Sequence, residues 1–275
     1  MRTLVGTRTR TCALLLVVTM TAGRAVAQDK PFQPQVGQAG KDVVWVPTPT
    51  EMVEKMLDLA RVTPQDFVVD LGSGDGRNVI AAAKRGAQSL GVEYNPDMVA
   101  LSKRNAASAG VAEKAQFVQG DMYLADFSKA NVLALFLLPS NLLQLRPKFL
   151  ELRPGSRIVS NTFYIEEWPP DQTVTVDDCA SWCTAILYIV PAKVAGTWRL
   201  PQGQLTLTQN YQMLTGTLVA GGQTAEVKGK LRGDEITFTS GQREFTGKVN
   251  GSAMEGTVKG GNAAPSSWTA TKGGN

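Results

Sequence analysis

The spacing of hydrophobic residues divides this chain into two parts. From residue 67 to residue 190, short apolar runs typical of buried strands alternate with stretches whose apolar side chains recur every three or four positions, as in helices. Beyond residue 191 the helical spacing ends, and short Thr-, Val- and Leu-rich runs separated by glycines follow. The pattern predicts an α/β domain over residues 28–192 and a small β-rich domain over residues 195–275.

The alternation in the first part predicts a Rossmann-like, mostly parallel sheet with helices on both faces and an antiparallel edge. A first helix is expected to start from Thr50 as its N-cap. Its apolar face consists of Val53, Met56, Leu57 and Ala60. Strands are expected at residues 67–71, 89–92, 115–118, 131–138, 157–163, 172–176 and 184–190, and helices at residues 77–84, from Asn95 onward, and at 142–150 with a break near Pro147. Residues 28–42 are expected to form an extended lead-in.

The second part has room for about eight strands, bracketed by Trp198 and Trp268. Asn250-Gly251 is a hairpin signal. Short strands joined by tight turns predict an antiparallel meander, either closed as a barrel or packed as a sandwich. No motif in this part indicates chemistry, so a structural or oligomerisation role is favoured over a ligand- or substrate-holding role.

The most informative motif is the glycine-rich turn at residues 72–76, Gly-Ser-Gly-Asp-Gly. It follows the apolar strand at 67–71 and precedes the helix at 77–84, an arrangement that presents backbone N–H groups to a nucleotide-like ligand. Glycine permits positive φ and lets the ligand touch the backbone. The spacing differs from the dinucleotide fingerprint G-x-G-x-x-G, so an NAD-linked enzyme is the weaker alternative. A tight turn without a ligand is the structural alternative.

Two acids follow the next two strands. Glu93 ends the second strand about 20 residues after the glycine turn, a position that suits the hydroxyl groups of a ribose. Asp121 follows the third strand within the run Gly120-Asp121-Met122. Three signals in this order, each at the carboxyl end of a strand, indicate a nucleoside site more strongly than any one of them. A solvated surface carboxylate is the alternative for each acid taken singly.

The turn after an acidic strand end resembles motif I of the class I methyltransferases that use S-adenosylmethionine. Residues 46–49 (Val-Pro-Thr-Pro), 70–77 (Asp-Leu-Gly-Ser-Gly-Asp-Gly-Arg) and 137–139 (Leu-Leu-Pro) are similar to those of the lysine methyltransferases that act on the c-type rotor protein of ATP synthase and of their bacterial relatives. The Leu-Gly-Ser-Gly core also resembles the histone lysine methyltransferases of seven-strand fold. The resemblance covers residue 46 to about residue 191 and leaves out the β-rich part.

This resemblance implies S-adenosylmethionine as cofactor. In such proteins the segment containing Thr48 and Pro49 folds over the cofactor, the acid at Asp121 accepts a hydrogen bond from the adenine amino group, and the next residue packs on the ring. The expected cofactor-binding residues are Thr48, Pro49, Asp70, Gly72, Ser73, Gly74, Asp75, Gly76, Glu93, Tyr94, Asp121, Met122 and Leu137. Candidates to assist proton loss from an amine acceptor are Tyr94, Asn161 and Tyr164, for each of which a structural role is the alternative.

Methyl transfer from a sulfonium needs an acceptor held against the methyl carbon and water kept out, more than it needs a nucleophilic side chain. The fourth strand ends in Phe-Leu-Leu-Pro at residues 136–139, where many amine-directed methyltransferases carry Asn/Asp-Pro-Pro-aromatic. An amino-adenine or glutamine acceptor is therefore disfavoured. A protein lysine or other protein amine is the expected acceptor, followed by a small molecule. The competing hypothesis is a non-catalytic, exported nucleoside-sensing protein on the same fold.

The formal charge of +4 does not indicate nucleic-acid binding. Four arginines precede the first acid, Asp29, and the chain from Gln28 onward has 24 basic and 24 acidic residues. Residues 1–27 have a basic start, an apolar run at 12–22 that is too short to span a bilayer, and an Ala-Val-Ala cleavage site, which together predict a signal peptide. The protein is expected in the bacterial periplasm or secreted, with a mitochondrial presequence as the alternative. No later segment is expected to span a membrane.

Two cysteines remain once Cys12 leaves with the leader. Cys179 and Cys183 are expected either to form a small-loop disulfide in an oxidising compartment or to stay as two buried thiols. The sequence has no histidine and no second cysteine pair, so no metal site is expected. The oligomeric state stays open.

Overall fold

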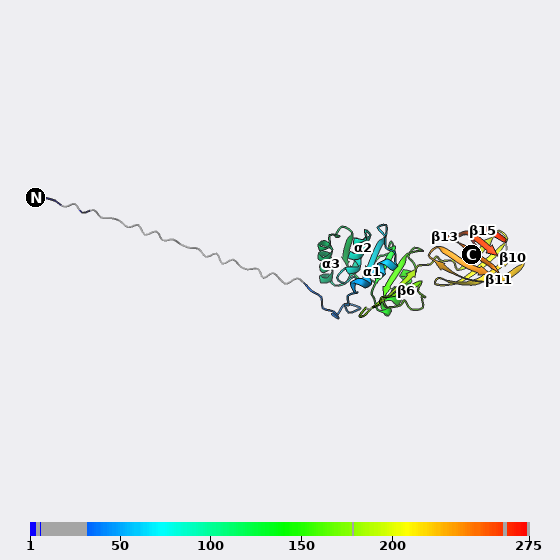
Figure 1. The fold of residues 1–275 in the computed structure, drawn as a ribbon, viewed down its shortest axis with the longest axis horizontal. Coiled ribbons are helices and arrows are strands. Elements are labelled where there is room, and N and C mark those ends of the chain that lie inside the picture. Colours follow the sequence, from blue (N-terminus) through cyan, green and yellow to red (C-terminus); the bar gives the residue numbers. More distant parts are fainter. Residues whose placement is uncertain (4–5, 7–31, 178, 261–262, 274–275) are drawn as a thin grey trace. The chain divides into compact units, whose positions relative to one another are not determined.

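The computed structural model describes residues 1–3, 6, 32–177, 179–260 and 263–273. The predicted signal peptide, with Cys12, falls almost entirely outside these ranges. Residues Gln33–Asn275 form one compact unit, which contains an open sheet flanked by helices and a closed barrel (Figure 1). The sheet and the barrel each have a hydrophobic core of their own.

The α/β region is built on a seven-stranded sheet with the strand order β3-β2-β1-β4-β5-β7-β6. Its strands are β1 (Phe67–Leu71), β2 (Gln88–Glu93), β3 (Ala115–Gln119), β4 (Val132–Leu135), β5 (Arg157–Asn161), β6 (Gln172–Thr175) and β7 (Thr184–Ile189). The first five strands run parallel, and β7 is antiparallel to both β5 and β6. The strand order reverses between β1 and β4, which is where such sheets bind ligands at their carboxyl edge. The Rossmann-like prediction is confirmed.

Helices cover both faces of this sheet, as predicted. They are α1 (Thr50–Leu59), α2 (Arg77–Lys84), α3 (Pro96–Ser108) and α4 (Pro139–Phe149), and Figure 1 labels the first three beside the sheet. Successive side chains of a strand point to opposite faces. Val68 therefore packs with Met56 of α1, whereas Val69 packs with Phe149 of α4.

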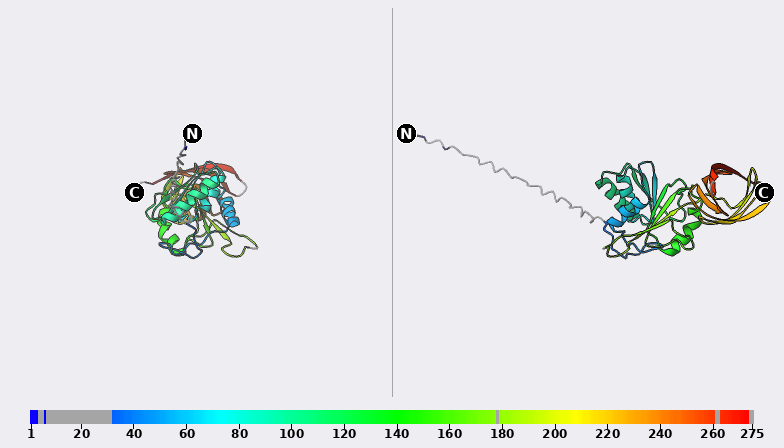
Figure 2. Two further views of the ribbon diagram at one scale, coloured as in Figure 1. Left: turned by 90° about the vertical axis from the view of Figure 1, so that its left-hand side faces the viewer. Right: turned by 45° about the vertical axis from the view of Figure 1, so that its right-hand side comes forward.

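The C-terminal region is a closed eight-stranded barrel, which decides between the two predicted architectures. Its strands are β8 (Gly196–Leu200), β9 (Gly203–Asn210), β10 (Met213–Ala220), β11 (Gln223–Arg232), β12 (Glu235–Ser240), β13 (Arg243–Asn250), β14 (Ala253–Gly260) and β15 (Ala263–Lys272). Each strand pairs antiparallel with the next, and β15 pairs with β8 to close the meander, whose curvature is visible in Figure 2.

Aromatic side chains fill the barrel interior. The rings of Phe238 and Phe245 stack with centroids 4.5 Å apart, and Trp268 meets both edge-on. A Cβ at Gly247 would lie 2.9 Å from the Trp268 ring, so glycine at this position makes room for the indole. The barrel is thus a packed core and holds no open channel at these residues.

Both ends of the helix predictions need correction. Pro49, and not Thr50, is the N-cap of α1, because the Pro49 carbonyl accepts the Val53 N–H. Helix α4 begins at Pro139, three residues before the predicted start, because proline at the first helical position has no N–H to leave unpaired. It is not broken at Pro147, which lies in the last turn.

Two predicted strands are shorter in the structure. The strand expected at 131–138 is limited to β4, because the chain turns after Leu135 and Leu138 already serves as the N-cap of α4. The strand expected at 157–163 ends at Asn161, because Thr162 has a φ of +62° and leaves the extended conformation.

The sheet and the barrel contact each other at the turn between β9 and β10. The ring of Tyr211 in this turn stacks on Trp168 at 5.6 Å between centroids, and Gln212 Nε2 donates to the Pro169 carbonyl at 2.6 Å. The connection from β7 to β8 contributes Ala192 and Val194 to the barrel core. Buried aromatic stacking of this kind holds the two cores together.

Cys179 and Cys183 form a disulfide in the loop between β6 and β7. This outcome selects the bridge over the pair of buried thiols. Within the described ranges, the helices fall short of the length and apolarity needed to cross a bilayer.

Candidate functional site

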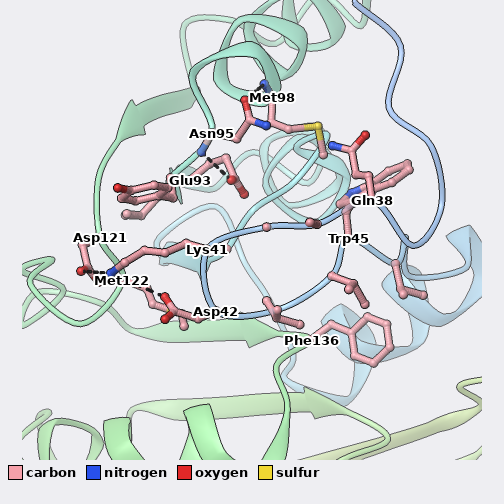
Figure 3. Close-up of a pocket in the computed structure, with 18 of the residues that line it drawn as sticks. Gln38, Lys41, Asp42, Trp45, Glu93, Asn95, Met98, Asp121, Met122 and Phe136 are labelled. Atoms are coloured by element: carbon pink, nitrogen blue, oxygen red, sulfur yellow. Dashed lines mark hydrogen bonds and ion pairs between the residues drawn. The ribbon is translucent and has the colours of Figure 1, made fainter.

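A pocket lies at the carboxyl ends of β1, β2 and β3 (Figure 3). Gly72, Glu93 and Asp121, which lie at or just after the ends of these strands, line it. Residues 38–46, called the strap below, close it on the other side. A smaller hollow adjoins the pocket between residues 45–48 and the glycine turn, and Phe136, which follows β4, lines both spaces.

The glycine turn has the conformation that its sequence predicts. Gly72, Gly74 and Gly76 have φ angles of 78°, 54° and 84°, a region that favours glycine. The Gly72 N–H donates to the Val92 carbonyl, which ties the turn to β2. A Cβ at Gly74 would lie 2.6 Å from Trp45 Nε1. The strap therefore packs directly on the turn.

Glu93 has its carboxylate held by two backbone groups. Its Oε2 accepts from the Gly74 N–H at 3.0 Å and its Oε1 accepts from the Asn95 N–H at 2.9 Å. Asn95 in turn caps α3, because its side chain accepts from the N–H groups of Asp97 and Met98. A carboxylate has about four lone-pair sites, so Glu93 keeps acceptor capacity toward the pocket, where it suits two ribose hydroxyls.

Asp121 is paired with the strap. Its Oδ2 lies 2.6 Å from Lys41 Nζ, as Figure 3 shows, and its Oδ1 accepts from the Tyr123 N–H at 2.8 Å. The hydrogen bond from Lys41 is the main reason that the pKa of Asp121 lies below its ordinary value. Lys41 Nζ also lies 5.2 Å from the centroid of the half-exposed Tyr94 ring. An adenine amino group that binds Asp121 must replace Lys41 or share the carboxylate with it.

The smaller hollow contains a buried acid and two unpaired polar atoms. Burial raises the pKa of Asp70, at the end of β1, well above its ordinary value, although Asn78 Nδ2 donates to it at 3.1 Å. Ser73 Oγ and Asn78 Oδ1 are buried without a hydrogen-bond partner in the part of the chain that the structure describes. Unpaired buried acceptors are costly, so this hollow suits a ligand that brings N–H donors.

Arg77 ties the Pro-Thr-Pro segment to the glycine turn. Its Nη1 donates to the Thr48 carbonyl at 2.5 Å, and its Nη2 lies 2.6 Å from Asp75 Oδ2. Asn105 of α3 donates to the Asp75 carbonyl from the other side at 2.9 Å. Thr48 is consequently buried beside the turn, and the segment that leads into α1 forms part of the site wall.

Most of the predicted cofactor-binding residues come together in this structure. Those that line the two spaces are Thr48, Asp70, Gly72, Ser73, Gly74, Asp75, Glu93, Tyr94, Asp121 and Met122. The other three lie behind the walls: Gly76 packs against the Phe117 ring, Leu137 packs behind Gly72, and Pro49 opens α1.

The three catalytic candidates do not form a cluster. Tyr94 lines the pocket, Asn161 is fully buried at the end of β5, and Tyr164 is half-exposed on the loop that follows. Sequence reasoning missed Lys41, Trp45 and Phe136, all of which line the site. Their sequence context contains no periodicity or motif that marks them. Among the described residues there is no group of three or more potential metal-ligating side chains.

Known proteins similar to this chain are methyltransferases. Residues 70–172 match the family described as ANTKMT methyltransferase domain. A protein-lysine N-methyltransferase of Saccharolobus islandicus (strain REY15A) is 39% identical over 151 residues, which cover 54% of this chain and 94% of that protein. The lysine N-methyltransferase of Mus musculus that is named for the c-type rotor protein of ATP synthase is 38% identical over 130 residues, which cover 47% of this chain and 52% of that protein. The chain thus spans about half the length of this second relative.

A solved structure extends the similarity to the fold. The RNA methyltransferase from Salinibacter ruber, in complex with S-adenosyl-L-homocysteine, is 43% identical with a TM-score of 0.51, covering 54% of this chain and 96% of that chain. The site residues fit this kind of ligand: Glu93 and Asp121 offer acceptors for hydroxyl and amino groups, and the hollow around Asp70 offers acceptors for an ammonium group. The chain belongs to the protein-lysine N-methyltransferase family and is a methyltransferase dependent on S-adenosyl-L-methionine.

Proposed function

We propose that this protein transfers a methyl group from S-adenosylmethionine to the ε-amino group of a lysine in a protein acceptor. The observation that carries the proposal is the 39% identity to a protein-lysine N-methyltransferase that is covered over 94% of its length. The mouse and human lysine N-methyltransferases named for the ATP synthase rotor protein, at 38% and 37% identity, support the same class of acceptor. Because the chain covers only about half of those relatives, the identity of their acceptor protein does not carry over.

The end of β4 supports an amine with a flexible stem as the acceptor. Phe136 lines both spaces of the site, in a run that places no amide or carboxyl side chain there. An apolar wall disfavours the charged form of a lysine and so lowers the pKa of its ammonium group. The neutral amine is the form that has a lone pair available for methylation.

The residues of the site position the reactants and exclude water. S-adenosylmethionine supplies a methyl group on a positively charged sulfur, which keeps the bonding electrons when the methyl group leaves. Glu93 and Asp121 are placed to orient the nucleoside, and the strap covers it. The acceptor nitrogen loses its proton to solvent before its lone pair bonds to the methyl carbon. Such in-line transfer gains its rate chiefly from positioning.

The test uses the chain from Gln28 onward and S-adenosylmethionine labelled with tritium in the methyl group. We expect label in protein of a membrane or periplasmic fraction, recovered as methylated lysine after hydrolysis. Glu93→Ala is expected to abolish labelling, whereas Glu255→Ala, an exposed position on the barrel, leaves it unchanged. Label in RNA would contradict a lysine acceptor. Tight S-adenosylhomocysteine binding without labelling of any fraction would favour the non-catalytic nucleoside-binding hypothesis.

We further propose that the protein acts outside the bacterial cytoplasm. The pattern of residues 1–27 supports this location, and so does the disulfide between Cys179 and Cys183, because disulfides persist in oxidising compartments. Export would separate the enzyme from the cytoplasm, where S-adenosylmethionine is made, so the cofactor would have to reach it there. N-terminal sequencing of the protein from a periplasmic extract is expected to begin at Gln28. Protein that keeps Met1 and stays in the cytosol would contradict the proposal.

A further inference from the structure

Three aromatic rings lie together at the carboxyl edge of the sheet, beside the cofactor pocket. Phe136 follows β4, Phe163 follows β5, and Trp182 lies in the loop before β7. The ring centroids are 5.4 Å apart for Phe136 and Trp182, 5.7 Å for Phe163 and Trp182, and 6.1 Å for Phe136 and Phe163. Each ring contacts the other two, so they form one cluster, called the aromatic triad below.

The aromatic triad connects the cofactor pocket with solvent. Phe136 is partly buried and lines both spaces of the site, whereas Trp182 is 36% exposed. Leu138 and Tyr164, which follow the same two strands as Phe136 and Phe163, are 38% and 51% exposed and extend the apolar surface. A side chain that enters the site over the end of β4 therefore meets these rings first.

Trp182 is placed in a way that core packing does not require. It has a φ of +60°, a conformation uncommon for residues with a side chain. It lies between Cys179 and Cys183, whose disulfide closes the loop. A tryptophan with a third of its surface exposed stabilises the fold less than one in a core, and backbone strain concentrates at functional sites. The loop therefore has the features of a binding element.

We propose that the aromatic triad binds the side chain of the acceptor lysine; the inference rests on the proposed function. The methylene stem of a lysine packs on aromatic rings as apolar surface, and its ammonium group is attracted to ring faces, most strongly to that of tryptophan. Trp182 receives the lysine at the outer end. Phe136, at the inner end, surrounds the nitrogen with apolar atoms next to the cofactor pocket.

A binding experiment tests this directly, without turnover. The five tryptophans of the chain are replaced by 5-fluorotryptophan, and the Trp182 resonance is assigned from Trp182→Phe. With S-adenosylhomocysteine at saturation, Nα-acetyl-lysine N-methylamide is titrated, and the norleucine analogue, which has no amine, serves as the control probe. We expect a saturable shift of the Trp182 resonance that is larger for the lysine probe. An unmoved Trp182 resonance, or equal shifts of Trp182 and the barrel residues Trp198 and Trp268, would overturn the proposal.

A turnover experiment separates this proposal from the proposed function. Trp182→Ala is expected to lower methyl transfer to the acceptor fraction by about tenfold, the loss expected for one cation–π contact, and to leave S-adenosylhomocysteine affinity unchanged. Trp182→Phe retains a ring face and most of the transfer. Met213→Ala, at an exposed barrel position, is the control. Full transfer by Trp182→Ala overturns the aromatic triad alone, whereas no transfer by the wild type overturns the lysine methyltransferase proposal while the lysine probe still tests the rings.

Discussion

The α/β region and the barrel bury different kinds of side chain. Among the described residues, the buried polar side chains of the α/β region include Asp70, Ser73 and Asn78 at the site, whereas those of the barrel are Gln212 and Ser240. The barrel interior otherwise consists of aliphatic and aromatic residues packed in one cluster. The contrast shows that the sheet concentrates buried polar groups where its strands end, while the barrel core is almost wholly apolar. Ligand chemistry belongs to the first and structural stability to the second.

The outer surface of the barrel fits the same division. Hydroxyl side chains at Thr237, Thr246, Thr257 and Ser267 are direct neighbours across four strands. Such cross-strand pairs contribute about 0.2–1 kcal/mol each to sheet stability. Changes in the barrel should therefore alter unfolding without altering cofactor binding, and changes at the sheet edge should do the reverse.

The largest effect is expected from Phe238→Ala in the barrel core. Phe238 is fully buried and stacks on Phe245, so its removal leaves a cavity that costs about 3–5 kcal/mol of unfolding free energy. Urea unfolding monitored by tryptophan fluorescence gives this loss, and calorimetry on the same variant should give unchanged S-adenosylhomocysteine affinity. A matching loss of affinity would show that the barrel takes part in binding.

Glu93→Ala should produce the opposite pattern. Loss of two charge-assisted hydrogen bonds to the ribose should cost about 2–4 kcal/mol of S-adenosylhomocysteine affinity. Since Glu93 also accepts the Gly74 and Asn95 N–H groups, a smaller loss of unfolding free energy accompanies it. Isothermal calorimetry with Glu255→Ala as the matched control measures the difference. Equal affinities for the two variants would remove Glu93 from the cofactor site.

Asp70→Asn should separate stability from binding within the α/β region. Burial holds the folded-state pKa of Asp70 well above its ordinary value of 3.8, so between these two pKa values the folded state binds more protons than the unfolded state. The free energy of unfolding of the wild type therefore falls as pH rises from about 3.8 through the folded-state pKa. The asparagine variant lacks this fall and should be the more stable of the two at neutral pH, as urea unfolding at several pH values will show. A difference between the two that is constant with pH would contradict this reasoning.

The smallest effect is expected from Lys41→Ala. Its exposed ion pair with Asp121 contributes little to stability, so thermal unfolding should be nearly unchanged. Because Lys41 competes with the adenine amino group for Asp121, its removal should strengthen S-adenosylhomocysteine binding a few-fold at low salt and less at high salt. Weaker binding would show that Lys41 helps to hold the cofactor and does not compete with it.

Local patterns predicted much of the fold. The bounds of β1 and α2 follow from the apolar run before the glycines and the glycine after the helix, and Asn95 caps α3 as its sequence predicts. Each of these signals acts over a few residues. The start of α4 and its passage through Pro147 were missed because a proline signals both the beginning and the end of a helix, and tertiary packing decides between them.

The site was only partly predictable for the same reason. Glu93 and Asp121 could be placed because strand ends share one edge of a parallel sheet. The strap could not, because its position depends on contacts between distant residues: Lys41 with Asp121, and Trp45 against Gly74. The spacing of Cys179 and Cys183 left their bonding open, and no pattern placed Trp182 beside Phe136.

A crystal structure of the protein with S-adenosylhomocysteine tests the central claim most directly, since it locates the ligand with respect to both regions. We predict the ribose on Glu93, the adenine amino group on Asp121 in place of Lys41, and the amino-acid end in the hollow beside Asp70, with the barrel unchanged. A nucleoside bound elsewhere, or a Lys41–Asp121 pair that stays intact with the ligand outside the pocket, would contradict the division of roles between the sheet edge and the barrel.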